Sequence, residues 1–151
     1  MSIANGEPME RIVLDCSIVM SWFFEDENDA YAEAIEATIP DLEFWVPGHW
    51  SLEIVNTALV GIRRGRTTDQ KVSDLRALIA TYPVIFDSET ADAAWGETRR
   101  LARLYNLSAY DAAYLELALR LKLPLATIDR PLAKAAGLAG VILFQPQQPT
   151  P

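Results

Sequence analysis

Four acidic residues occupy positions from which their carboxylates can share a divalent cation. Asp15 and Asp129 each follow a short apolar run, whereas Glu53 and Asp111 stand inside segments with the residue pattern of helices. Carboxylates brought close together repel one another, and a hard cation removes this repulsion because it prefers carboxylate and water oxygens. The four acids therefore predict a Mg²⁺ site, with Mn²⁺ as a substitute, if the fold brings them to one place.

Each acid also has an ordinary structural alternative. Asp15 and Asp129 are suitable N-caps for a following helix, because an aspartate accepts hydrogen bonds from unpaired backbone N–H groups. Asp111 stands three residues after Ser108, which imitates a capping box, although that motif prefers Glu or Gln. A helical glutamate such as Glu53 is most often solvated. These alternatives stay open from the residues alone.

Short polar side chains accompany three of the acids. Ser17 follows Asp15 by two residues and Thr127 precedes Asp129 by two, so either hydroxyl can hydrogen-bond a carboxylate or a metal-bound water. Asn56 stands three residues after Glu53. Asparagine is a poor residue for the middle of a helix, which raises the interest of this pair.

Short apolar runs alternate with helical segments along the chain. Strands are predicted at 11–15, 43–46, 84–87, 124–127 and 141–144. Helices are predicted at 28–39, 49–64, 68–81, 88–105, 108–121 and 130–137. Continuous apolar runs are typical of parallel strands covered on both faces, so the alternation predicts a three-layer α/β fold with right-handed crossovers. Ligands bind at the carboxyl ends of such strands, where two of the acids stand.

Apolar spacing also predicts which helix faces point inward. In segment 49–64 the inward stripe is predicted to be Leu52, Val55, Leu59 and Ile62, with Glu53 beside it.

Three further details of the helices follow from residue type. Segment 68–81 is predicted to begin at the N-cap Thr68, and segment 130–137 to end at Gly137. In segment 88–105, Ala91 and Trp95 are predicted to face inward.

The composition indicates one globular domain. The chain has 151 residues, of which 50% are hydrophobic and 23% charged, enough for a sizeable core. We expect one domain over 11–144, a flexible N-terminus over 1–10 and a flexible Pro-rich tail over 145–151. With no secretory signal, no membrane-spanning run and a single Cys16, a cytoplasmic location is expected.

The net charge limits the modes of nucleic-acid binding. At −8, the chain is not expected to coat nucleic acid broadly. A nuclease remains open, because local arginines can still contact a phosphate backbone. The two arginine clusters are Arg63, Arg64 and Arg66, and Arg99, Arg100 and Arg103, and both are first interpreted as helix-end cations on solvated faces.

A few other residues invite a chemical role. His49 is the single histidine and is expected at the surface or at a helix cap. Cys16 is interpreted as a small buried side chain rather than a nucleophile. Trp22, Phe23 and Phe24 are consecutive, so one helix face cannot bury all three, and part of this cluster is expected to stay exposed or to contact another chain.

Four segments together resemble a known family. They are "LDCSIV", "SLEIVN", "SAYDAAYLELA" and "LPLATIDRPLAKAAG". Their order and spacing resemble the PIN-domain nucleases and, more narrowly, the VapC-type toxins of VapBC toxin–antitoxin modules. The resemblance extends from Arg11 to Phe144.

The resemblance implies a site, an activity and partners. Asp15, Glu53, Asp111 and Asp129 would bind the metal, and Ser17, Asn56 and Thr127 would support them. It further implies strand order 3-2-1-4-5, cleavage of RNA phosphodiester bonds by metal-activated water in a type II toxin–antitoxin system, a homodimer, and a VapB-type antitoxin.

Other functions remain open from the sequence. A phosphohydrolase of the haloacid dehalogenase type needs a second aspartate two residues after the first, and this chain has Ser17 there. A DNA nuclease of the same fold, or a non-catalytic module that binds nucleic acid or protein, stays as the alternative to the ribonuclease.

Overall fold

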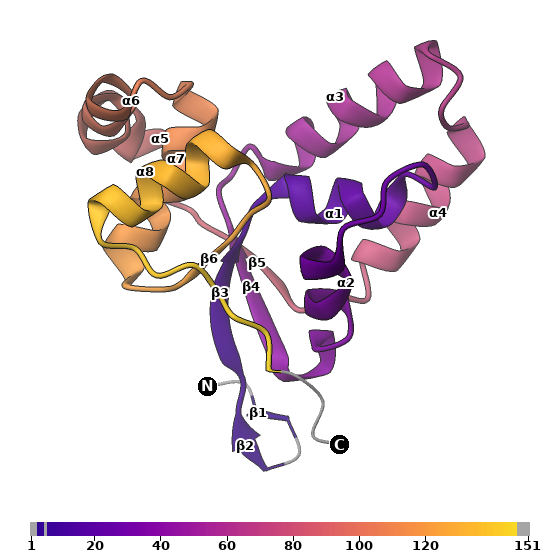
Figure 1. Cartoon of the computed structure of the whole chain (residues 1–151), viewed down its shortest axis with the longest axis horizontal. Helices are drawn as coiled ribbons and strands as arrows, with labels where there is room; N and C mark the ends of the chain where they lie inside the picture. The colour runs from indigo at the N-terminus through magenta and orange to yellow at the C-terminus, as the bar shows by residue number, and fades with distance from the viewer. Residues whose placement is uncertain (1–2, 5, 148–151) are drawn as a thin grey trace.

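A four-stranded parallel sheet forms the centre of the molecule. The computed structural model describes residues 3, 4 and 6–147 (Figure 1). The strands of this sheet are β3 (Glu10–Leu14), β4 (Leu42–Val46), β5 (Val84–Phe86) and β6 (Leu125–Ala126). They lie in the order β5-β4-β3-β6, and every neighbouring pair is parallel. The predicted parallel α/β architecture is confirmed.

The predicted fifth strand, 141–144, is reduced to a single bridge. Leu125 pairs with Leu143 in parallel register. The Leu125 N–H donates to the Ile142 carbonyl at 3.0 Å, and the Phe144 N–H donates to the Leu125 carbonyl at 2.8 Å. The segment therefore lies beside β6, in the fifth position of the predicted order 3-2-1-4-5. Because β6 has only two residues, it offers too short an edge for a regular fifth strand.

The chain ends are described only in part. Strands β1 (Ile3–Ala4) and β2 (Glu7–Pro8) form a small antiparallel sheet, which projects from the domain at the bottom of Figure 1. The predicted flexible segments 1–10 and 145–151 include residues 1, 2, 5 and 148–151, which lie outside the described residues.

Helices cover both faces of the sheet. They are α1 (Cys16–Phe23), α2 (Ala30–Glu36), α3 (Trp50–Arg63), α4 (Asp69–Ile79), α5 (Thr90–Ala93), α6 (Arg99–Tyr105), α7 (Ala109–Leu121) and α8 (Arg130–Ala139), with a 3₁₀ turn at Ile39–Asp41. In Figure 1, α1 to α4 lie to the right of the sheet and α5 to α8 to its left. Among the described residues, no helix combines the length and apolarity required to cross a bilayer.

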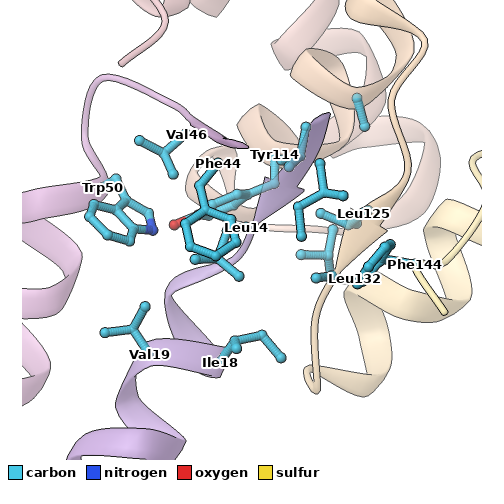
Figure 2. Packing of buried hydrophobic residues seen from close by; sticks show 14 of the residues in the cluster. Leu14, Ile18, Val19, Phe44, Val46, Trp50, Tyr114, Leu125, Leu132 and Phe144 are labelled. Atoms are coloured by element: carbon cyan, nitrogen blue, oxygen red, sulfur yellow. The ribbon is translucent and has the colours of Figure 1, made fainter. Parts of the chain in front are cut away.

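The core gathers apolar side chains from strands and helices alike. Figure 2 shows Leu14 and Phe44 of the sheet among helical side chains that include Ile18 and Tyr114. All four are fully buried. Burial of such a side chain contributes about 1.5–3 kcal/mol, so this cluster holds the helical layers against the sheet.

The predicted inward stripe of α3 is wrong. Leu52 is 74% exposed, and Val55 and Leu59 are exposed as well. The buried face instead carries Ile54 and Ala58, together with Gly61. Small residues on that face let α3 approach α1 closely, and the larger apolar residues are left on the outer face. The buried face thus has large residues, Trp50 and Ile54, in its first half and small residues, Ala58 and Gly61, in its second half.

Segment 88–105 is not one regular helix. It divides into α5, a π-helical turn (Ala94–Thr98) and α6. The wider turn rotates the residues that follow it. Thr98 and Leu101 are buried, while Trp95 is 85% exposed. Ala91 is also exposed. The predicted inward positions of Ala91 and Trp95 are therefore wrong.

Two helix ends predicted from residue type have opposite outcomes. The Thr68 side chain accepts a hydrogen bond from the Lys71 N–H, which confirms the N-cap of α4. Helix α8 does not stop at Gly137 but continues to Ala139, and Gly140 terminates it at φ 83°. A positive φ is easiest for glycine, so the second glycine ends the helix.

The aromatic cluster after β3 packs within the chain. Phe24 is 2% exposed, and the Arg66 guanidinium lies 3.9 Å from the centre of its ring. Trp22 and Phe23 are half-buried, and the Trp22 indole N–H donates to the Ala32 carbonyl at 2.7 Å. Arg66 also forms ion pairs with the acids of the loop after α1, which fastens the α3–α4 turn to α1.

Gly61→Ala is expected to lower the free energy of unfolding by up to about 2 kcal/mol. The new methyl carbon would lie 2.6 Å from Phe24 Cε1, and overpacking of a closed site costs about 1–3 kcal/mol against a helix-propensity gain of about 1 kcal/mol. The matched control is Gly137→Ala in α8, where nothing lies within 4 Å. Urea denaturation measures both variants. A Gly61→Ala variant as stable as Gly137→Ala, which gains the same helix propensity, would contradict the close packing of α3.

Candidate metal centre

The site begins where β3 and β6 end side by side. These strands are parallel neighbours, with Leu14 opposite Ala126. The next N–H, that of Asp15, donates to the Ala126 carbonyl at 3.0 Å. The chain therefore leaves both strands at the same edge of the sheet, and this pairing brings Asp15 beside Thr127, as the sequence predicted for the two strand ends.

Asp15 is buried and held by two hydroxyls. It is 3% exposed. Its Oδ2 accepts hydrogen bonds from Ser17 Oγ at 2.6 Å and from Thr127 Oγ1 at 2.7 Å. The same hydroxyls accept hydrogen bonds from the backbone N–H groups of Ile128 and Asp129. The side chain makes no capping bond to α1, so capping does not explain this aspartate.

The environment of Asp15 favours its protonated form. Burial raises the pKa of Asp15 to about 6, although the hydrogen bonds from Ser17 and Thr127 act in the opposite direction. The negative charges of Glu53 and Asp111 raise it further. A carboxylate at this position is therefore short of positive charge, which is the deficit that a bound cation removes.

The side chain of Glu53, on α3, contacts Tyr114, on α7. Its Oε1 accepts a hydrogen bond from the Tyr114 hydroxyl at 2.6 Å. The same oxygen lies 2.9 Å from His49 Nε2, without the alignment of a hydrogen bond, since that nitrogen has no hydrogen-bond partner among the described residues. Burial acts to raise the pKa of Glu53, but His49 and Tyr114 outweigh it and the pKa is lowered. Glu53 is thus an ionised, half-buried group rather than a solvated helix residue.

Asp111 faces the other acids from the first turn of α7. Ser108 is the N-cap of this helix, and its hydroxyl accepts the Asp111 N–H at 3.1 Å. Burial raises the pKa of the Asp111 carboxyl, and the charges of Asp129 and Glu53 raise it further. The capping role belongs to Ser108, which leaves the Asp111 carboxyl available to the site.

Asp129 both caps helix α8 and lies near another of the acids. It is the N-cap of α8, and its Oδ1 accepts the Leu132 N–H at 2.9 Å. The capping alternative is therefore correct for this residue. Its charge nevertheless acts on the Asp111 carboxyl, so the cap also lies within the electrostatic range of the other acids.

The four acids form one electrostatic cluster, but they do not form a compact ligand set. Asp15 is affected by Glu53 and Asp111, and Asp111 by Glu53 and Asp129. Within residues 3, 4 and 6–147, no three acidic, His or Cys side chains lie close enough to hold a metal ion. Four carboxylates suit Mg²⁺ by their chemistry, and Glu53 would have to turn from Tyr114 to share one. The predicted metal site stays a prediction.

The predicted supporting residues divide into two groups. Ser17 and Thr127 both hold Asp15. Asn56 is exposed and makes no hydrogen bond with the four acids in the described part of the chain. Its place on the outer face of α3 follows from the inverted packing of that helix.

Tyr114 and His49 are site residues that the sequence analysis missed. Tyr114 is fully buried, and its hydroxyl also accepts the Cys16 N–H at 3.4 Å. His49 occupies the predicted N-cap position of α3, but its side chain makes no capping bond. It is partly buried and packs edge-on against Tyr114 at 5.6 Å. The available signal was spacing, since Tyr114 follows Asp111 by three residues and His49 precedes Glu53 by four.

The Cys16 thiol is not a nucleophile. Burial raises its pKa well above the ordinary value, and the charges of Asp15 and Glu53 raise it further. A thiol that stays protonated at neutral pH is unreactive.

Comparisons with known proteins bear on the fold. A family model described as PIN domain matches residues 12–138. No match was found among curated proteins. Among solved structures, PAE2754 from Pyrobaculum aerophilum has 22% sequence identity and a TM-score of 0.61, and the match covers 85% of this chain and 80% of that chain.

Two further solved structures are similar over most of the chain. VapBC2 from Rickettsia felis, bound to a DNA fragment from their promoter, has 15% identity and a TM-score of 0.60, with 89% of this chain and 97% of that chain covered. A toxin–antitoxin complex from Klebsiella pneumoniae has 21% identity and a TM-score of 0.55, with 91% and 98% covered. At these identities the likeness establishes the fold.

Asp15→Asn is expected to stabilise the metal-free protein at pH 7 by up to about 3 kcal/mol. The pKa of Asp15 is about 6 in the native state against 3.8 ordinarily, and each pKa unit corresponds to about 1.4 kcal/mol. Since the native state holds this proton more tightly, Asp15 lowers stability as pH rises from about 4 to about 6, and the full loss remains above pH 6.

Urea denaturation in EDTA between pH 4 and pH 8 measures this effect. The difference between wild type and Asp15→Asn should shrink as the pH falls toward 4. Asp92→Asn, at an exposed position of α5, is the control and should show no such trend. A difference that does not vary with pH would overturn the assignment to Asp15.

Proposed function

Because the chain belongs to the PIN domain family, we propose that it is a Mg²⁺-dependent endoribonuclease and the toxin component of a type II toxin–antitoxin module. Membership confirms the resemblance seen in the sequence. The observation that carries the proposal is the environment of Asp15, a buried carboxylate whose proton affinity is raised by burial and by two neighbouring acids. A structural aspartate has no need of further acids around it.

The residues divide the proposed chemistry among them. When bound, Mg²⁺ lowers the pKa of a water and offsets the charge of the scissile phosphate. Ser17 and Thr127 fix the orientation of Asp15 by hydrogen bonds to one oxygen. Tyr114 and His49 keep Glu53 ionised. One of the four carboxylates accepts the proton of the attacking water. The oxygen of that water then bonds to phosphorus and displaces the leaving oxygen of the phosphodiester.

Protein partners follow from the proposed module. One of the similar structures is a toxin–antitoxin complex from Klebsiella pneumoniae, and this supports a VapB-type antitoxin as the partner of the present chain. A homodimer is proposed as well. The outer face of α3 carries exposed Leu52, Val55 and Leu59, and contiguous exposed apolar surface is typical of protein contacts.

Cleavage of RNA by antitoxin-free protein tests the proposed activity. Cleavage should require Mg²⁺ or Mn²⁺, stop in EDTA, and fall at least about 100-fold in Asp15→Asn and in Asp111→Asn, because each removes a charge that positions the reacting groups. Asp92→Asn should cleave normally. Single-stranded DNA of the same sequence is the competing substrate.

Three outcomes would overturn the proposed activity. Cleavage that survives in EDTA or in both aspartate variants belongs to another site or to a contaminant. Equal or better cleavage of DNA identifies a DNA nuclease. Failure to cleave any RNA, including total RNA from the cell that encodes the chain and therefore contains any narrow target, would identify a binding module.

The proposed homodimer is tested by sedimentation equilibrium. The purified chain should have twice the mass of a single chain at micromolar concentration. A concentration-independent monomer would contradict the homodimer without affecting the cleavage test.

A further inference from the structure

A groove of about 640 Å³ lies between the end of α6 and one face of α8, from Arg130 to Leu138. Its lining includes Leu104, Tyr105, Asn106, Arg130, Lys134 and Leu138, and no acidic residue lines it. In a chain with net charge −8, this groove is lined by two cations and no acid, whereas a smaller groove between α3 and α4 is lined by one cation, Arg76, and no acid.

Both walls of this groove lead to the acids of the candidate metal centre. On one wall, Arg130 is the first residue of α8 and directly follows Asp129. On the other wall, Asn106 ends α6 in the left-handed conformation, two residues before Ser108, the N-cap of the helix that carries Asp111. Each wall of the groove is thus connected, within five residues along the chain, to one of the four acids, although neither of these acids lines the groove.

The two cations of the groove are not engaged by acids. Of the other eleven Arg and Lys side chains, all within the described residues, five form ion pairs with carboxylates and six do not. In the described part of the chain, Arg130 and Lys134 have no acid within ion-pair distance, and both are exposed. They stand one turn apart on one face of α8, about 6 Å along its axis, and so can contact successive phosphates.

Apolar side chains complete the lining. Leu104 is 59% exposed and Leu138 is 68% exposed, while Tyr105 is partly buried beside them. Phosphate groups alone would not use such surface, but the bases and sugars of an unpaired strand present apolar faces. A duplex keeps its bases stacked inside and would leave this surface uncovered. The combination of paired cations and apolar residues fits a single strand.

We propose that the groove between α6 and α8 binds the single-stranded RNA substrate beside the scissile phosphate. Arg130 and Lys134 contact phosphates of the adjoining nucleotides, and Leu104 and Leu138 contact bases or sugars. This inference rests on the proposed function, because it assigns the position of that function's substrate. It identifies α8 as the element that aligns the strand with the acids.

The experiment measures RNA binding apart from cleavage. The parent is Asp111→Asn in Mg²⁺ buffer, chosen so that the RNA stays intact, and the probe is a fluorescein-labelled single-stranded RNA followed by anisotropy over a range of salt concentrations. Adding Arg130→Ala and Lys134→Ala should weaken binding roughly tenfold. The slope of log affinity against log salt concentration should become shallower by about 0.7 for each phosphate that the protein no longer neutralises.

A matched control separates this groove from general electrostatics. Arg63→Ala with Arg76→Ala removes the same charge from exposed positions on α3 and α4, which lie on the opposite side of the molecule from α8 in Figure 1. This pair should change affinity less than twofold. Thermal unfolding of both double variants checks that each remains folded, and a cation at the first position of a helix does not stabilise it.

The results distinguish this inference from the proposed function. Equally weakened binding in the two double variants, an unchanged salt dependence, or no RNA binding by the parent would each overturn the groove. A change in sedimentation without a change in RNA binding would overturn it as well and would identify a protein contact. RNA binding that depends on Arg130 and Lys134, in a chain that cleaves no RNA, would support the groove as an RNA-binding site and would contradict the proposed ribonuclease activity.

Discussion

The parallel pairing of β3 with β6 is the constraint on which the rest of the structure depends. These strands are separated by more than a hundred residues, yet the pairing of Leu14 with Ala126 and the hydrogen bond from Asp15 to Ala126 align their ends. That alignment brings the Thr127 hydroxyl to Asp15 and directs α8 away from the same edge. The pairing also buries Asp15, so its negative charge is removed from water and needs hydrogen-bond donors or a cation nearby.

The acids and their hydrogen-bond partners come from both helical layers. Asp15 leaves the sheet toward α1, Glu53 comes from α3, and Asp111 comes from α7. The Tyr114 hydroxyl connects the layers, since it donates to Glu53 and accepts from the Cys16 backbone. A fully buried tyrosine normally finds a partner for its hydroxyl. Here the partner is an acid of the site, so packing of the core and orientation of the carboxylate are one requirement.

The sequence predicted correctly where the strands lie and which aspartates follow them. Continuous apolar runs located the strands, and the two aspartates that follow them were placed at the correct edge. The sequence did not predict correctly which face of a helix is buried. Leu52 was assigned to the core by its three- and four-residue spacing, whereas the buried face of α3 carries Ile54 and Ala58. Ala91 and Trp95 share an exposed face, so the inward face of this segment was predicted wrongly even before the π-helical turn. Tyr114 was missed because its partner lies 61 residues away.

The chain order of the acids has a consequence for fragments of the protein. Asp15 and Glu53 precede the turn between α4 and β5, and Asp111 and Asp129 follow it. A single proteolytic nick in that turn would therefore divide the acids two and two, and neither fragment would retain the site. The fragments would remain joined by β4–β5 and β3–β6 pairing, by the hydrogen bond between Tyr114 and Glu53, and by the shared hydrophobic core. Their reassociation would restore all four acids together, so complementation of the two halves would be all-or-none.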